Sequence, residues 1–338
     1  MARRTRIVGI IAAVGLALSS PIRADRKAYT RAGKALDAAR GSGRPLVLHF
    51  VQLSHRRGPT LAKAFYSKRA ADKKAEECVV AVLSLRHNRS LAKKYGAENF
   101  ISMAVALNPW DGEELGRKVL VERFTYWIAG GEGENVHSSE FFAFIDEGIE
   151  TYCQIMTESY LPALKRAKDE DFAKPDDQLV GAVRFVGYKQ LADYVDPLRR
   201  IVASERGSLS LKIAATESLA QIDDPKVCRV LAALLGGPMK IATVAKDALI
   251  DKGDASIDPC FDALARTDSK MECTRLVGIL TKLVKQRSKH RADKWLMAPA
   301  ETRKEWIAEW RAHLPEKPPA DAPKPAEARA KDQDTEKD

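Results

Sequence analysis

The chain has 338 residues, of which 45% are apolar and 30% are charged, and its formal net charge is +10. This apolar content is ordinary for a globular protein, which excludes a wholly disordered chain, and the length suggests about two domains. After residue 24 no apolar stretch reaches about 18 residues, which excludes a polytopic membrane protein.

The first 24 residues have the three-part layout of a bacterial secretory signal. Three arginines (Arg3, Arg4 and Arg6) precede an apolar run over residues 7–18, and the small residue Ala24 stands before Asp25. We therefore expect cleavage after Ala24 and export to the periplasm or cell envelope. The apolar run is short for crossing about 30 Å of hydrocarbon. An uncleaved membrane anchor and a buried first helix remain the alternatives.

Positive charge is concentrated in one part of the chain. Residues 1–24 hold four arginines and no acidic residue, so the chain from residue 25 onward carries +6. Residues 44–94 contain twelve Lys or Arg and three acidic residues. A basic face 44–94 would attract an anionic partner. For an exported protein we expect a phospholipid, a cell-wall polymer or an acidic protein, and no nucleic acid; a solvated basic face is the structural alternative.

Up to about residue 152, helical segments alternate with short apolar runs that predict buried strands. Helices are expected at 26–40, 60–65, 90–95 and 138–152, and strands at 45–51, 78–85 and 101–107. The turn 108–112 then leads back into 114–121 as a hairpin. This order predicts an α/β sandwich with a mixed sheet.

Residues 26–160 resemble the thioredoxin fold. The resemblance rests on Gly43–Phe50, on Gly58-Pro59 entering a helix, and on 91–97 followed by a strand and 108–112. The redox members of that family carry CxxC after the first core strand, whereas 50–61 contains no cysteine here. If Gly58-Pro59 is aligned with the centre of the motif, Arg57 and Thr60 occupy the cysteine positions. The family's cis-proline is also missing, since Phe100-Ile-Ser-Met103 occupies its place. Thiol–disulfide exchange needs a thiolate, so this site is expected to be redox-inactive.

The same loop supplies the candidate binding residues, His55, Arg56, Arg57 and Thr60. The arginines suit contact with an anion or a protein, and His55 is a conceivable general base. A solvated loop is the structural alternative. No metal motif or nucleotide-binding motif is present, so we expect no cofactor and no metal. Whether the chain is an enzyme stays open, with a non-catalytic protein favoured.

Five cysteines stand at Cys78, Cys153, Cys228, Cys260 and Cys273. Their number is odd and no spacing fits a metal site. Apolar neighbours predict that most of them are buried small side chains. The alternative is a thiol–disulfide oxidoreductase that uses a displaced cysteine, either Cys78 or Cys153.

The second half predicts a helical repeat. Leu219, Leu249 and Leu280 are 30 and 31 residues apart, and each ends a similar pattern of small and apolar residues within Asp193–Leu283. Turns and a second amphipathic helix (227–235 and 257–265) separate them. Two helices per unit resemble short bacterial HEAT-like repeats, which stack as a solenoid. An all-helical domain without a repeat is the alternative.

The predicted organisation is a signal peptide (1–24), a thioredoxin-like domain without CxxC (25–165), HEAT-like repeats (175–314) and a disordered tail (315–338). A connecting helix is expected at 154–168. Trp295, Trp306 and Trp310 are expected to cap the repeats, with an exposed aromatic ligand platform as the alternative. Both domains point to a non-catalytic exported scaffold that binds a protein partner in the cell envelope.

Overall fold

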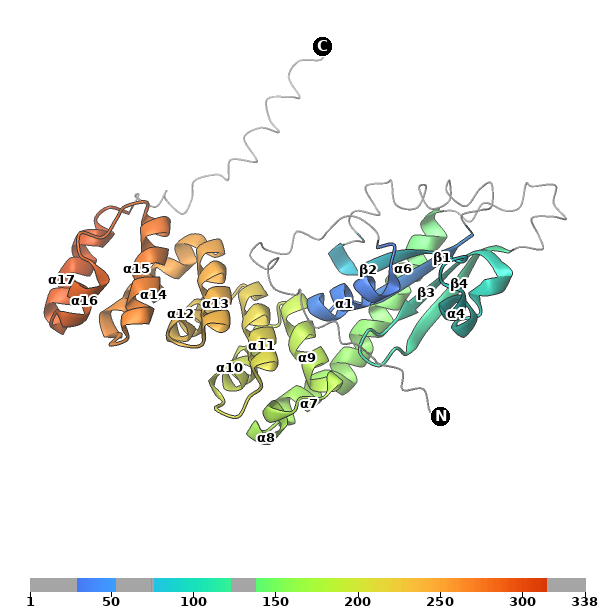
Figure 1. Ribbon diagram of the computed structural model, residues 1–338, viewed down its shortest axis with the longest axis horizontal. Coiled ribbons are helices and arrows are strands. Elements are labelled where there is room, and N and C mark those ends of the chain that lie inside the picture. The colour runs from blue at the N-terminus through green and yellow to red at the C-terminus, as the bar shows by residue number, and fades with distance from the viewer. Residues whose placement is uncertain (1–28, 53–73, 75, 123–137, 315–338) are drawn as a thin grey trace, which may run out of the picture. The chain divides into compact units, whose positions relative to one another are not determined.

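The computed structural model describes residues 29–52, 74, 76–122 and 138–314 (Figure 1). The predicted signal peptide, the predicted disordered tail and the helix expected at 60–65 lie outside these ranges. The chain divides into two compact units between Pro259 and Cys260. The boundary that the sequence places at 165–175 stays a prediction.

A mixed four-stranded sheet lies in the first unit. Its strands are β1 (Leu46–Val51), β2 (Val79–Ser84), β3 (Phe100–Leu107) and β4 (Glu114–Glu122), in the order β2-β1-β3-β4. The β1 and β2 strands are parallel, with Leu46 opposite Val79, whereas β3 is antiparallel to both β1 and β4. The predicted strands, the hairpin and the mixed sheet are confirmed.

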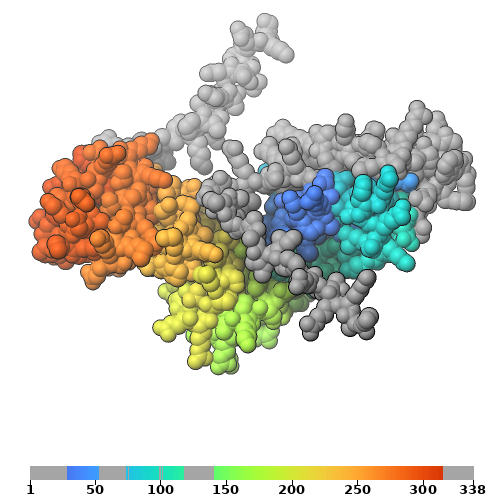
Figure 2. Space-filling model, viewed as in Figure 1, coloured from blue at the N-terminus to red at the C-terminus, as the bar shows by residue number. Residues whose placement is uncertain are grey.

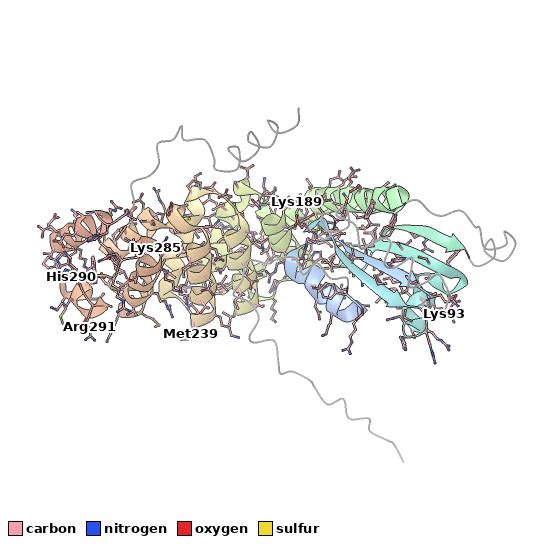
Figure 3. All side chains as sticks on the ribbon, turned by 90° about the horizontal axis from the view of Figure 1, so that it is seen from above. Lys93, Lys189, Met239, Lys285, His290 and Arg291 are labelled. Atoms are coloured by element: carbon pink, nitrogen blue, oxygen red, sulfur yellow. The ribbon has the colours of Figure 1, made fainter. Side chains whose placement is uncertain are left out.

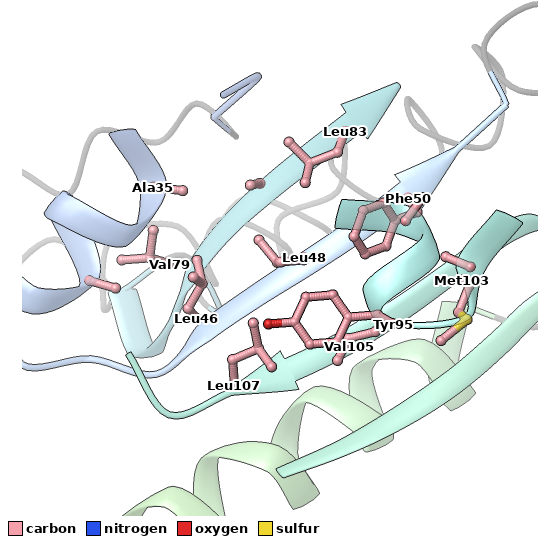
Figure 4. Close-up of a cluster of buried hydrophobic side chains, with 14 residues drawn as sticks. Ala35, Leu46, Leu48, Phe50, Val79, Leu83, Tyr95, Met103, Val105 and Leu107 are labelled. Carbon is pink, nitrogen blue, oxygen red and sulfur yellow. The ribbon is translucent and has the colours of Figure 1, made fainter. Parts of the chain in front are cut away.

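Both faces of the sheet are covered, which explains why β1 is apolar on both sides. One face packs with Ala35 and Ala39 of α1 (Ala32–Ser42) and with Ala92 of α4 (Arg89–Lys94), around Phe50 and Leu48 (Figure 4). Figure 2 shows blue α1 packed directly against the cyan part of the sheet region. Phe141, Phe144 and Ile145 of α6 (Ser138–Ile155) cover the other face.

The first helix differs from its predicted range of 26–40. Tyr29 pairs with Ala81 at the edge of the sheet, so the helix starts only at Ala32. It runs past Gly41 and ends at Gly43, whose φ of 70° is left-handed. Glycine takes up this conformation without steric cost, which makes it a common helix end. The spacing of apolar residues alone does not show that Tyr29 pairs with the edge strand and so moves the start of the helix.

The expected connecting helix at 154–168 is not a separate element. Helix α6 continues through a π-helical turn (Met156–Tyr160) into α7 (Leu161–Arg166). The turn buries Met156 and Tyr160, and a π turn shifts the register of a helix without ending it. The short helix α8 (Asp169–Ala173) follows.

Five more helices lie within the first unit, and polar side chains cap the starts of three of them. Asp176 accepts a hydrogen bond from the Leu179 amide at the start of α9, Ser208 does so from Leu211 at α11, and Asp224 from Lys226 at α12. The helices are α9 (Asp177–Tyr188), α10 (Val195–Ala203), α11 (Leu209–Gln221), α12 (Pro225–Ala233) and α13 (Met239–Asp251). Short 3-10 turns lie at Ala97–Asn99, Ala192–Tyr194, Leu234–Gly236 and Gly253–Ser256.

The division between the units falls within α14 (Ile257–Arg266). The second unit continues with α15 (Lys270–Val284), α16 (Ala292–Met297) and α17 (Ala300–Arg311). Arg303 of α17 is 7% exposed. Its guanidinium donates to the carbonyls of Leu296, Ala298 and Thr267, which satisfies a buried charge with backbone acceptors.

Candidate functional site

The four residues expected to bind a partner, His55, Arg56, Arg57 and Thr60, lie outside the described residues. The structure shows the strand that leads to them. β1 ends at Val51, which is opposite Ser84 on β2 and Ser102 on β3. In the described chain no peptide bond is cis.

A buried histidine–serine pair lies two residues before the end of β1. The Nε2 atom of His49 is 2.7 Å from the Ser102 hydroxyl, and both residues are fully buried. The ring also lies against Phe141 of α6, with 5.5 Å between centroids. Burial lowers the pKa of His49 to about 3, so the imidazole is neutral at ordinary pH. With neither residue exposed, the pair is structural rather than a nucleophile and base, and no sequence spacing indicated it.

The cysteines have the burial that the sequence predicts. All five thiols are free, four are buried, and Cys153 is partly exposed. Burial raises the pKa of Cys78 to about 12 and also raises that of Cys273. Because the thiolate is the reactive form, Cys78 has the properties of a packing residue.

Two cations of the 44–94 segment are held inside the fold near Cys78. Burial lowers the pKa of Arg44, which donates to Ser42 and to the Glu76 carbonyl. Lys74 forms ion pairs with Glu77 and with Asp146 of α6. Burial opposes charge on Lys74, but these hydrogen bonds raise its pKa overall. Both side chains therefore already bind groups of the protein itself. The basic segment 44–94 is not one continuous exposed face.

A different part of the segment is exposed. Four cations protrude from α4 and the turn before it, namely Arg86, Arg89, Lys93 and Lys94. No salt bridge joins any of them to a described carboxylate. Lys93 projects from the outer side of α4 (Figure 3). We name these four residues the α4 cationic cluster.

The turn after β3 connects the sheet to the helices of the first unit through hydrogen bonds. The Tyr160 hydroxyl donates to Asp111 at 2.9 Å and is 3.2 Å from the Asn108 amide. The Trp110 indole donates to Tyr152, whose hydroxyl donates in turn to the Gly43 carbonyl at 2.8 Å. Burial raises the pKa of Tyr160 to about 12, so it stays a hydrogen-bond donor.

Glycines let α9 approach this turn. A Cβ atom on Gly181 would lie 3.0 Å from Trp110 and from Tyr160, and one on Gly43 would lie 2.5 Å from the Arg184 carbonyl oxygen. Arg40 of α1 also donates to the Pro109 carbonyl at 2.7 Å. We call this set of contacts the α9 junction. It fixes the sheet against the first helices and contains no group arranged for catalysis.

The repeat positions predicted from the sequence are buried. Leu219 and Leu249 in the first unit and Leu280 in the second are each 0% exposed. Between α9 and α11, a Cβ atom on Gly187 would lie 2.8 Å from the Ser218 Cα, so small residues set this helix contact. α11 packs against α9, α10 and α13, as expected of successive helix pairs.

Large apolar side chains are exposed at equivalent positions of two of these helices. Leu209, the first residue of α11, is 46% exposed, and Met239, the first residue of α13, is 73% exposed. Met239 projects from the helical part of the unit (Figure 3). In the second unit, Met271 of α15 is 54% exposed at the second helical position. The spacing of Leu209 and Met239 can be read from the sequence, but the exposure of their side chains cannot.

The tryptophans of the second unit form a packed end. Trp295 and Trp310 are 1% and 4% exposed, and the ring of Trp306 lies 5.2 Å from that of Trp295. His290 stacks on Trp306 with 3.6 Å between centroids. The hollow beside these rings encloses about 20 Å³, enough for about one water molecule. The burial of Trp295 and Trp310 is the property expected of a cap.

The described residues contain no group of three or more His, Cys, Asp or Glu side chains that could hold a metal ion. Among the helices that the structure describes, none combines the length and apolar character needed to span a membrane. Searches with this chain find no matching protein-family model, curated protein or solved structure. Its function is therefore argued from its own residues.

Proposed function

We propose that the chain is a non-catalytic interaction protein of the cell envelope. In this proposal a thioredoxin-like domain without redox cysteines is joined to HEAT-like repeats, and the repeats bind a protein partner. The observation that carries the proposal is the repeated exposure of Leu209 and Met239 above the buried leucines of the same helices.

The fold supports both resemblances. The parallel β1–β2 pair, the β3–β4 hairpin and the helices on both faces fit the thioredoxin-like reading. The helix pairs α10/α11 and α12/α13 fit stacked repeats, because their 30-residue spacing places similar residues at similar depths.

Leu209 and Met239 suit the apolar anchor of a protein interface. Interface centres are depleted of charge and enriched in large apolar side chains, methionine among them. Methionine is also flexible enough to fit partners of different shape. The partner is therefore expected to present an apolar segment to the starts of α11 and α13.

Site-specific photocrosslinking tests this proposal. A photoreactive residue is placed at Leu209 or at Met239 in the full-length chain in the producing cell, with a matched control at exposed Lys189, which directly follows α9. We expect one partner to be captured from both apolar positions and not from Lys189, and the double variant Leu209→Glu/Met239→Glu to abolish its binding. Capture of different proteins at the two positions, or equal capture at Lys189, would contradict the proposal.

Export is the second part of the proposal, and it rests on residues 1–24. The test is cell fractionation combined with N-terminal sequencing of the purified protein. We expect a mature chain that starts at Asp25 in the envelope or periplasmic fraction. A chain that keeps residues 1–24 in the membrane fraction would replace secretion with anchoring.

The oxidoreductase alternative is favoured by one observation, the partial exposure of Cys153. Its test is a disulfide-reductase assay on the purified protein beside a variant with all five cysteines changed to serine. Reduction of a model disulfide by the first protein alone would establish redox chemistry. The burial of the other four thiols leads us to expect no activity from either protein.

A further inference from the structure

The α4 cationic cluster is held on a rigid support. Ala92 of α4 and Tyr95, which directly follows the helix, are 1% and 7% exposed within the core of the sheet. The turn before the helix is also fixed, because the Asn88 amide donates to the Ser84 carbonyl at 2.9 Å. The cations therefore protrude from one defined surface rather than from a loose segment.

The cluster lacks the neutralisation seen at a neighbouring cation. Arg117 of β4 lies close to α4 and donates to the Tyr95 carbonyl, but Glu114 also binds it with two hydrogen bonds. The carboxylate of Glu98 is exposed near the cluster, and among the described residues no ion pair joins it to α4. Helix α1, which packs on the same face of the sheet, adds exposed Lys34 and Asp37, and exposed Arg31 stands directly before it. The local charge is thus strongly positive.

The composition of this surface favours a lipid surface over a protein. The outward positions of α4 and its preceding turn are Arg86, His87, Arg89, Ser90, Lys93 and Lys94, with no large apolar residue among them. Protein interfaces depend on buried apolar or aromatic anchors, and lysine is depleted in them. Anionic headgroups need no such anchor, since basic residues near a membrane are attracted by the surface potential.

The course of the chain brings this surface close to the membrane during export. Tyr29 pairs with Ala81 of β2, and β2 leads into the turn before α4. Only residues 19–28 separate Tyr29 from the apolar run 7–18, a reach of about 35 Å at full extension. Stable membrane attachment commonly combines one apolar segment with one basic patch.

We propose that the α4 cationic cluster binds the anionic headgroups of a lipid bilayer. This inference is separate from the protein contact proposed at Leu209 and Met239. A basic outer face on α4 would hold the sheet against the membrane while the helices bind their partner. It also narrows the expected basic face of 44–94 to one helix and its preceding turn.

Vesicle co-sedimentation tests the proposal. The protein as isolated from the producing cell is mixed with vesicles containing phosphatidylglycerol or with vesicles of phosphatidylcholine alone. The variant Arg89→Gln/Lys93→Gln/Lys94→Gln is compared with the control Lys226→Gln/Arg229→Gln/Lys240→Gln, which removes as many exposed charges from α12 and α13. At about fivefold for each cation, we expect the α4 variant to lose on the order of a hundredfold in affinity for the anionic vesicles.

The expected result also includes weak binding to phosphatidylcholine and loss of binding at high salt. Equal affinities of the two variants would overturn the proposal, as would equal binding to both kinds of vesicle. Tighter, cluster-dependent binding to polyglutamate than to the anionic vesicles would replace the lipid with an acidic protein. Unchanged crosslinking at Met239 in the α4 variant keeps this outcome distinct from the protein-binding proposal.

Discussion

The α9 junction and the helix pairs that follow it hold the first unit together by different kinds of contact. The junction depends on single features, such as left-handed Gly43, the close approach of Gly181 to Trp110, and the hydrogen bond from Tyr160 to Asp111. The helix pairs bury similar apolar residues 30 residues apart, such as Leu219 and Leu249. No other contact in the junction can replace one of these single contacts when it is lost. In the helix pairs, similar contacts occur in more than one place, so the residues that make them can differ from pair to pair.

The largest expected loss of stability is at the α9 junction, from the substitution Gly43→Ala. A left-handed non-glycine residue costs about 1–3 kcal/mol, and crowding against the Arg184 carbonyl adds about 1–3 kcal/mol. We expect the free energy of unfolding to fall by about 4 kcal/mol, measured by urea denaturation with circular dichroism.

The matched control for Gly43 is Gly33, which lies in α1 with open space around it. Alanine there is expected to stabilise the helix by about 0.5–1 kcal/mol. Equal effects of the two substitutions would show that the junction does not require glycine at position 43.

The repeated contacts predict a second result, since Leu219→Ala and Leu249→Ala remove the same side chain from equivalent buried positions. Each is expected to lower the free energy of unfolding by about 3 kcal/mol through lost burial and a cavity. The half-exposed Leu209→Ala should change it by less than about 0.5 kcal/mol. Effects at Leu219 and Leu249 that differ by more than about 2 kcal/mol would argue against equivalent repeats.

The elements of the sheet could be predicted from the sequence because short apolar runs bounded by turns have few alternatives. Features set by distant partners could not be predicted. The pairing of Tyr29 with Ala81 delays the first helix, and the π turn at Met156–Tyr160 joins two expected helices. The partnership of His49 with Ser102 depends on strand register, which no local pattern shows.

The candidate surfaces show the same limit. The basic composition of 44–94 was visible in the sequence, but the inward direction of Arg44 and Lys74 was not. The 30-residue spacing of Leu209 and Met239 was also visible in the sequence. Only the packing shows that these two side chains stay exposed while Leu219 and Leu249 are buried.

A third prediction concerns pH and the core of the sheet. The pKa of His49 is about 3 in the folded protein and 6.5 in the unfolded chain. Between these values the unfolded chain binds the proton and the folded protein does not, so stability falls as the pH is lowered. The loss is about 1.4 kcal/mol per pH unit below 6.5, or about 2 kcal/mol at pH 5.

The variant His49→Gln keeps a donor near Ser102 but cannot titrate. Its stability should therefore fall less than that of the unmodified protein between pH 7 and pH 5, with a difference of about 2 kcal/mol. The free energy of unfolding of both proteins is measured by urea denaturation at pH 7 and at pH 5. Parallel changes in the two proteins would mean that burial does not lower the pKa of His49 in the folded protein.

The smallest effect is expected from removing one hydroxyl at the α9 junction. Tyr160→Phe deletes the hydrogen bond to Asp111 but keeps the ring against Gly181. Asp111 also accepts from the Asn108 amide and from the Glu113 backbone, so its carboxylate stays partnered. We expect a loss of about 1 kcal/mol in the free energy of unfolding.

The control for Tyr160 is Tyr194→Phe. The Tyr194 ring lies under Lys165, and its hydroxyl has no hydrogen-bond partner among the described residues. This change should alter the free energy of unfolding by less than about 0.5 kcal/mol. If the two phenylalanine variants are equally stable, the junction depends on the packing of glycines and aromatic rings alone. A clear loss of stability at Tyr160 would show that polar contacts also hold the sheet against α9. The buried apolar contacts of Leu219 and Leu249 need no such polar partner.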